Sequence, residues 1–205
     1  SAASDVYKRQ GNGKTTGSLV MINASDGDIM FSPGKNSFSG GEGTLASGSA
    51  SHTEGYYTSA QGDYSHAEGS TSIASGEAAH AEGGGSVAVG KNSHAEGTNC
   101  RASGEASHAE GKGTDANSGQ HVQGKYNVED RLGKYAHIVG NGTNTDTQSN
   151  AHTLDWSGNA WFAGDVYVGS TSGTNKDDGS KKLATEEYVD GQMTTINCLL
   201  YTSDA

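Results

Sequence analysis

The sequence predicts an all-β protein, a solenoid built from coils of 14 residues. Histidine recurs at this spacing five times, at His52, His66, His80, His94 and His108. The 205-residue chain also contains 32 glycines and one proline. Because Gly costs about 1 kcal/mol per helical position, this content disfavours helices, and a fixed short period is typical of stacked repeats.

Each histidine opens a short motif that ends in glutamate and glycine. The glutamates recur with the same period, at Glu54, Glu68, Glu82, Glu96 and Glu110. Between the motifs lies a second column, Ala46, Ala60, Ala74, Ala88, Ala102 and Ala116, whose first five members are followed two residues later by glycine. One coil is therefore predicted to contain two short strands, with glycine supplying the backbone angles of both corners.

Strand alternation places the middle residue of each motif inside the coil, opposite the alanine column. These residues are all small: Ser39, Thr53, Ala67, Ala81, Ala95 and Ala109. Such an interior buries only one or two methyl groups per half-turn, each contributing roughly 0.8 kcal/mol. We therefore expect other copies of the chain to cover the remaining faces, in a homotrimer.

Two resemblances support this interpretation over about Ser37 to Gly124. The stretch Ser86–Ser93 reads Ser-Val-Ala-Val-Gly-Lys-Asn-Ser and resembles the repeat of trimeric autotransporter adhesin heads. The Ser-His-Ala-Glu-Gly variant resembles repeats of phage tail and appendage proteins. The resemblance implies a left-handed β-roll, a homotrimer and a fibrous surface protein. In the adhesin heads, aliphatic residues occupy the two positions that are His and Glu here, so their inner and outer faces do not transfer directly.

The flanking segments complete the predicted organisation. Residues 1–10 and 198–205 match the two reading directions of one sequencing adapter and are expected to take no part in the fold. We expect an entry β segment at 11–36, the repeat domain at 37–124, a β connector at 125–169, a loop at 170–182 and the start of a helix or coiled coil at 183–197.

The connector contains the aromatic residues Trp156, Trp161, Phe162 and Tyr167. We expect them in the core of a small sheet, and stacking on sugars is the alternative. The helix is expected to begin at Thr185, whose side chain can cap it. Both segments resemble parts of phage tail fibres.

The His and Glu columns are the candidate functional residues. The outward positions of the other strand, on either side of each alanine of the second column, vary from coil to coil and are expected to face solvent. A face that repeats is expected to contact another subunit, so we predict that both columns line the seam of the trimer, with raised histidine pKa values. A zinc or nickel ladder is the alternative; no cofactor is expected.

The favoured function is that of a structural or adhesive module, not an enzyme. The fragment would belong to a phage tail fibre or virion appendage that binds a host receptor or glycan through other parts. The alternatives are a bacterial trimeric adhesin head on the cell surface, or the border of a self-cleaving appendage domain. The net charge of −11 argues against binding to nucleic acid. The sequence contains no apolar run of about 18 residues, so no membrane-spanning helix is predicted.

Overall fold

The computed structural model describes residues 33–164, 167–168 and 181–182. The chain divides into two compact units, Ser1–Trp161 and Phe162–Ala205. Both adapter-like ends, the predicted entry β segment before residue 33 and the predicted helix at 183–197 lie outside the described residues. Among the residues that are described, no helix has the length and apolar character needed to cross a membrane.

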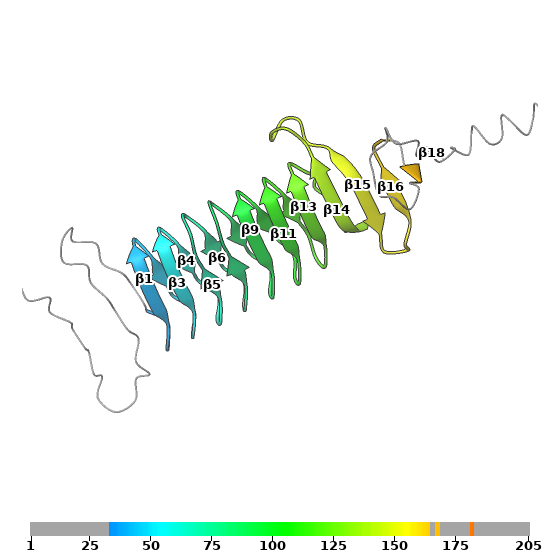
Figure 1. Ribbon diagram of the computed structural model, residues 1–205. Coiled ribbons are helices and arrows are strands. Elements are labelled where there is room, and N and C mark those ends of the chain that lie inside the picture. Colours follow the sequence, from blue (N-terminus) through cyan, green and yellow to red (C-terminus); the bar gives the residue numbers. More distant parts are fainter. Residues whose placement is uncertain (1–32, 165–166, 169–180, 183–205) are drawn as a thin grey trace, which may run out of the picture. The chain divides into compact units, whose positions relative to one another are not determined.

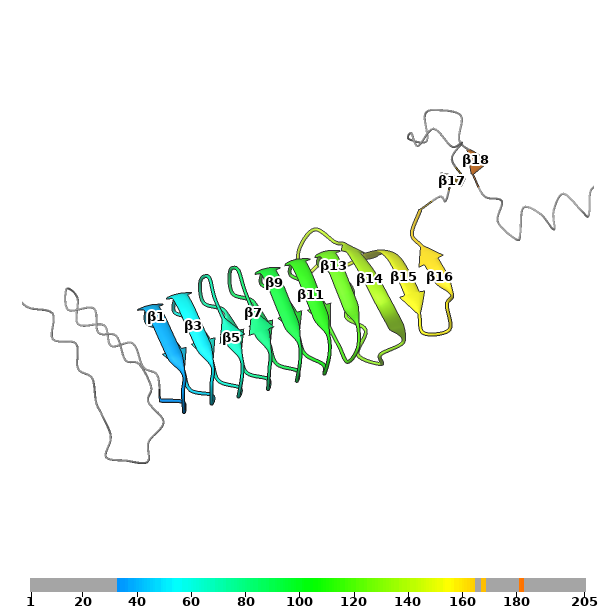
Figure 2. The same cartoon turned by 60° about the horizontal axis from the view of Figure 1, so that its bottom comes forward.

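The repeat domain is a stack of coils with one strand of each coil in each of two sheets, and strands of successive coils pair in parallel (Figures 1 and 2). The first sheet has ten strands, β1 (Phe38–Glu42), β3 (His52–Tyr56), β5 (His66–Ala67), β7 (His80–Ala81), β9 (His94–Thr98), β11 (His108–Lys112), β13 (His121–Lys125), β14 (Tyr135–Asn141), β15 (Asn150–Asp155) and β16 (Ala160–Phe162). The second has six, β2 (Leu45–Ala46), β4 (Ser59–Ala60), β6 (Ile73–Ala74), β8 (Val87–Ala88), β10 (Arg101–Ala102) and β12 (Asp115–Ala116). This arrangement confirms the predicted β-solenoid.

Successive coils are in register, so each residue lies beside its equivalent in the next coil. In the first sheet His52 pairs with His66, and in the second Ala60 pairs with Ala74. The pairing continues across the shorter spacing between His108 and His121. The connecting loop therefore absorbs the missing residue and leaves the sheet intact.

The interior is filled by the two small columns that the sequence predicts. Ala67, Ala81, Ala95 and Ala109 of the first sheet are fully buried, as are all six alanines of the second. Larger residues continue the first column toward the C-terminal end, where Val122 pairs with Ile138 and both are fully buried. The coil therefore widens where the repeat ends.

Two further inward columns carry hydroxyl groups, which were not among the expected interior positions. A buried serine precedes His52, His66, His94 and His108, whereas Ala79 precedes His80. The serine hydroxyl donates to the carbonyl of the glycine three residues earlier, as Ser65 does to Gly62 at 2.6 Å. At the other corner, the buried Thr58 donates to the Glu54 carbonyl at 3.1 Å. These bonds give each buried hydroxyl an acceptor, which explains why a polar residue is stable inside.

The role predicted for glycine is correct at only one of the two corners. Gly83, in the histidine motif, has a φ of +93°. At the other corner the left-handed angle belongs instead to a residue two positions after the glycine, and Ala78, with a φ of +53°, is an example. The preceding Gly76 is needed for another reason, because a Cβ there would lie 2.1 Å from the carbonyl oxygen of Gly90.

Beyond the coils, β14 pairs with β15 in antiparallel fashion. The predicted burial of the connector tryptophans is wrong for the single chain: Trp156 is 59% exposed and Trp161 is 55% exposed. The connector strands extend the edge of the first sheet, and no second layer among the described residues encloses these rings. In the second unit, β17 (Tyr167–Val168) pairs with β18 (Lys181–Lys182).

Candidate functional site, the histidine and glutamate ladder

The candidate site is the outer face of the first sheet, where the two repeating columns lie side by side. We call this set the ladder; it comprises His52, His66, His80, His94 and His108 with Glu54, Glu68, Glu82, Glu96 and Glu110. Because the inward residue of each motif lies between them, the His and Glu of one strand point to the same side. The in-register pairing then places equivalent side chains one above another.

The imidazole rings form a continuous parallel stack. Ring centroids of His52 and His66 are 4.6 Å apart with planes inclined by 1°, and those of His80 and His94 are 4.7 Å apart at 4°. These distances equal the spacing of neighbouring strands. The rings are therefore held by the backbone register.

The structure extends the histidine column beyond the five predicted members. His121 stacks on His108 at 4.8 Å, and His137 and His152 follow with tilted rings. His121 is not among the predicted members because it follows His108 by 13 residues, one fewer than the period. The motif His121-Val122-Gln123-Gly124 preserves the outline of the repeat and could have identified it.

Each glutamate lies between the histidine of its own strand and that of the next coil. The Nε2 atom of His80 lies 3.4 Å from Oε1 of Glu68, and the equivalent distance from His94 to Glu82 is 3.7 Å. These contacts bring the opposite groups close, but they exceed the usual hydrogen-bond range of about 2.7–3.2 Å. The Nε2 atoms of His66, His80, His94 and His108 are shielded from solvent and have no hydrogen-bond partner.

The expected rise in histidine pKa is not found in the single chain. Burial, followed by the neighbouring imidazoles, lowers the pKa of His66 and His94 from 6.5, although nearby glutamates act in the opposite direction. Protonation of these histidines therefore destabilises the folded chain. The stability of the neutral form is fully present above pH 6.5 and is lost as the pH falls through 6.5 toward the folded pKa.

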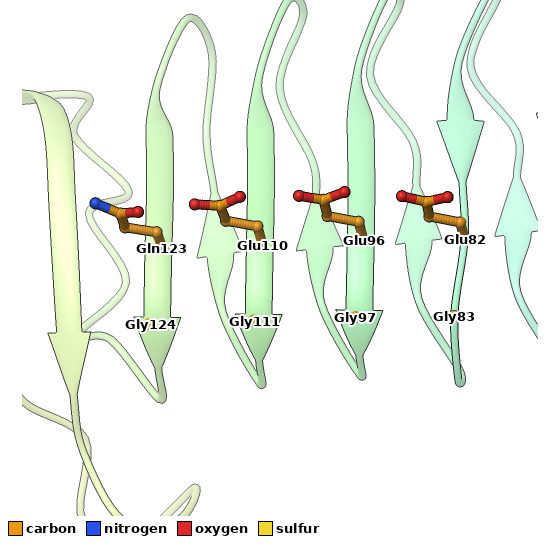
Figure 3. A pocket seen from close by; sticks show the side chains of 8 residues that line it. All are labelled: Glu82, Gly83, Glu96, Gly97, Glu110, Gly111, Gln123 and Gly124. Carbon is orange, nitrogen blue, oxygen red and sulfur yellow. The ribbon is translucent and has the colours of Figure 1, made fainter.

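An open groove of about 510 Å³ runs along the glutamate column. It is lined by Glu82, Glu96, Glu110 and Gln123 together with the glycine that follows each of them. Figure 3 shows the three carboxylates and the Gln123 amide in a row, one from each successive strand. The adjacent glycines leave room beside the row, so the carboxylates are accessible from solvent.

Two groups in the ladder have the composition and spacing of a metal site. They are His66, Glu68 and His80, and His94, Glu96 and His108. Within each group the candidate ligand atoms lie within 4.8 Å of one another. Imidazole and carboxylate together are ligands that suit zinc.

The outward face of the second sheet has no comparable order. Its residues at one position of successive coils include the partly exposed Ile73 and Val87 and the exposed Arg101. At Asp115, burial and the charge of Glu129 raise the pKa to about 6. The charged carboxylate therefore costs folding free energy at neutral pH, and this cost declines as the pH falls from about 6 toward the ordinary value of 3.8.

A second hollow, of about 320 Å³, lies beside the connector strands. Its lining residues are Lys134, Tyr135, Asn150, Thr153, Asp155, Asn159, Ala160 and Trp161. It thus combines an exposed indole ring with charged and amide side chains. Such a hollow offers an apolar ring face beside hydrogen-bonding groups.

The comparisons with known proteins concern the coils. Two copies of the YadA head domain repeat match residues 67–93 and 81–99, which include His80 and His94. No curated protein matches the chain. The phage resemblance therefore receives no support from a matching protein, whereas the adhesin resemblance does. Over these repeats the chain is similar to the β-roll heads of trimeric autotransporter adhesins.

Proposed function

We propose that this chain is part of the head of a trimeric adhesin on a bacterial surface. The observation that carries the proposal is the match of the YadA head domain repeat to consecutive coils of a β-solenoid. A stack of coils in register forms a rod, and a rod can carry binding surfaces away from a cell. The proposed role is attachment by surface contact.

The ladder is the proposed seam between subunits. A single chain buries mainly alanines and hydroxyl residues, so covering an outer face would add to its stability. The ladder repeats in every coil, and its side chains are about one third exposed, as for His80 at 35% and Glu68 at 32%. A uniform face can meet the same uniform face of another copy in every coil.

We expect the 205-residue chain to form trimers at micromolar concentration in buffer containing EDTA. Replacing both His80 and His94 with glutamine should shift the light-scattering mass toward the monomer and raise the dissociation constant at least tenfold. The control is Gln61→Ala together with Arg101→Ala, on the opposite face, which should leave the mass unchanged. A folded wild-type monomer, or equal weakening by both pairs, would contradict the seam.

The adhesive role is expected to involve the exposed aromatic residues. Beads coated with the chain should be retained on layers of animal or bacterial cells more strongly than beads coated with heat-unfolded chain. Replacing Trp161 with alanine should reduce retention at least threefold, because it removes the stacking surface of the second hollow. The control is Leu132→Ala, since Leu132 is 95% exposed and does not line that hollow.

No difference between folded and unfolded chain on any cell layer would oppose an adhesive role. Retention that is unaffected by Trp161→Ala would oppose the involvement of this hollow. The phage-stalk alternative predicts capsid and tail genes beside the full-length gene. The adhesin proposal predicts a membrane-anchoring segment at its C-terminal end.

A further inference from the structure

Four histidine Nε2 atoms of the ladder are buried without a hydrogen-bond partner, which is unusual for polar groups. In His66, His80, His94 and His108 this atom is shielded from solvent and lacks a hydrogen-bond partner. A carboxylate oxygen lies opposite three of them, at 3.4 Å for His80, 3.7 Å for His94 and 3.6 Å for His108. A buried polar atom without a partner is costly, and a spacing repeated in each coil indicates a common cause.

These separations fit a metal ion better than a hydrogen bond. Zinc binds imidazole nitrogen at about 2.0–2.1 Å and carboxylate oxygen at about 2.0–2.2 Å, so two ligands of a tetrahedral ion lie about 3.4 Å apart. The Nε2 of His80 and Oε1 of Glu68 are separated by 3.4 Å. An ion placed between them would be held at tetrahedral geometry without movement of either atom.

We propose that the ladder binds zinc(II) at two sites per chain, one formed by His66, Glu68 and His80 and the other by His94, Glu96 and His108. In the first site a nitrogen and an oxygen are already at the required spacing of 3.4 Å, and in the second the corresponding pair is 3.6 Å apart. The second imidazole, within 4.8 Å, completes the site by tilting out of the stack. Two histidines, one glutamate and water form an open four-coordinate zinc site.

The number of ions follows from the stacking. Each Nε2 atom can bind one ion, so a site that uses His66 and His80 leaves His94 and His108 for the next. Glu82, which lies between the two sites, stays free and keeps the ions apart. The groove along the carboxylates includes Glu96 and so provides access to the second site.

Metal binding requires imidazole nitrogens that are free to coordinate, and the Nε2 atoms of His80 and His108 lie on the side of the sheet that carries the carboxylates. Each zinc ion also offsets repulsion along the column of glutamates, whose charges are separated by about one strand spacing. All ligands of one site come from a single chain, so the inference does not depend on the proposed trimer.

The test is zinc titration of the 205-residue chain by calorimetry, with bound metal measured after dialysis. We expect two zinc ions per chain, and a shift of the histidine Nε2 resonances in nitrogen-15 NMR spectra. Glu68→Gln combined with Glu96→Gln removes one ligand from each site and nearly preserves side-chain shape. This variant should weaken zinc binding at least tenfold while its circular dichroism spectrum stays unchanged.

The matched control is Glu77→Gln, since Glu77 pairs with Lys91 on the exposed surface at 3.1 Å. It should still bind two ions. Fewer than one ion per chain in the wild type, or equal affinity in the Glu68 and Glu96 double variant, would overturn the proposal. Binding that excess magnesium displaces would also overturn it, because magnesium prefers oxygen ligands. Light scattering in EDTA tests the trimer separately.

Discussion

Replacing Gly83 with alanine is expected to unfold most of the solenoid at room temperature, with a loss of about 4 kcal/mol or more in the free energy of unfolding. Gly83 has a φ of +93°, and a Cβ there would lie 2.1 Å from the carbonyl oxygen of Gly97. That oxygen cannot withdraw, since it accepts hydrogen bonds from the Gly84 amide at 2.8 Å and the Ser86 hydroxyl at 3.2 Å. The clash therefore breaks the register between two coils.

The adjacent glycine provides the control. A Cβ at Gly84 would meet nothing within 4 Å, so Gly84→Ala should change stability by less than about 1 kcal/mol. Both variants add one methyl group in the same corner. Urea unfolding followed by far-ultraviolet circular dichroism gives the comparison, and similar midpoints for both variants would show that the coils are not packed in this register.

The second large effect is expected for Ala88→Leu. Ala88 is fully buried and lies between Ala74 and Ala102 of the neighbouring coils. The neighbouring coils stack directly on this strand along the rod. Across the interior lie the alanines of the first sheet, which are also fully buried, so the two sheets are close together. Three additional carbons must therefore force the two sheets apart, at a cost of about 3 kcal/mol.

The neighbouring Val87 lies on the outward face of the same strand and is partly exposed. Val87→Leu enlarges a side chain that can extend into solvent, so its unfolding midpoint should stay close to that of the wild type. Thermal unfolding of both variants distinguishes an inward from an outward column. An equal loss in the two would mean that the face of this strand is assigned incorrectly.

The sequence was sufficient to predict the coils, because the stacking of equivalent residues and the narrow interior both require the same small residue at each inward position. The in-register stack repeats the environment of Ala67 at Ala81 and Ala95, so one small position produces a column that is visible in the sequence. The hydroxyl columns were harder to recognise. Serine and threonine are usually exposed, and only the corner geometry reveals the carbonyl to which Ser65 donates.

The other features that the sequence did not predict depend on the three-dimensional surroundings of the residues. Spacing alone could not place His121 in the stack, because a loop absorbs the missing residue. The direction of the histidine pKa shift required the depth of burial and the distance between rings, and these favour the neutral form of His94. The exposure of Trp161 depends on the absence of a covering layer in the described part of the connector.

The in-register stack also makes the length of this domain adjustable in uniform steps. Each coil contacts mainly the coils before and after it, as in other solenoids. Recombination between DNA segments that encode equivalent residues, such as His66 and His80, adds or removes 14 codons without changing the reading frame or the corners. Each event changes the reach of the rod by one strand spacing, about 4.8 Å. Such a protein can evolve as a ruler, with its reach set by the copy number of one unit.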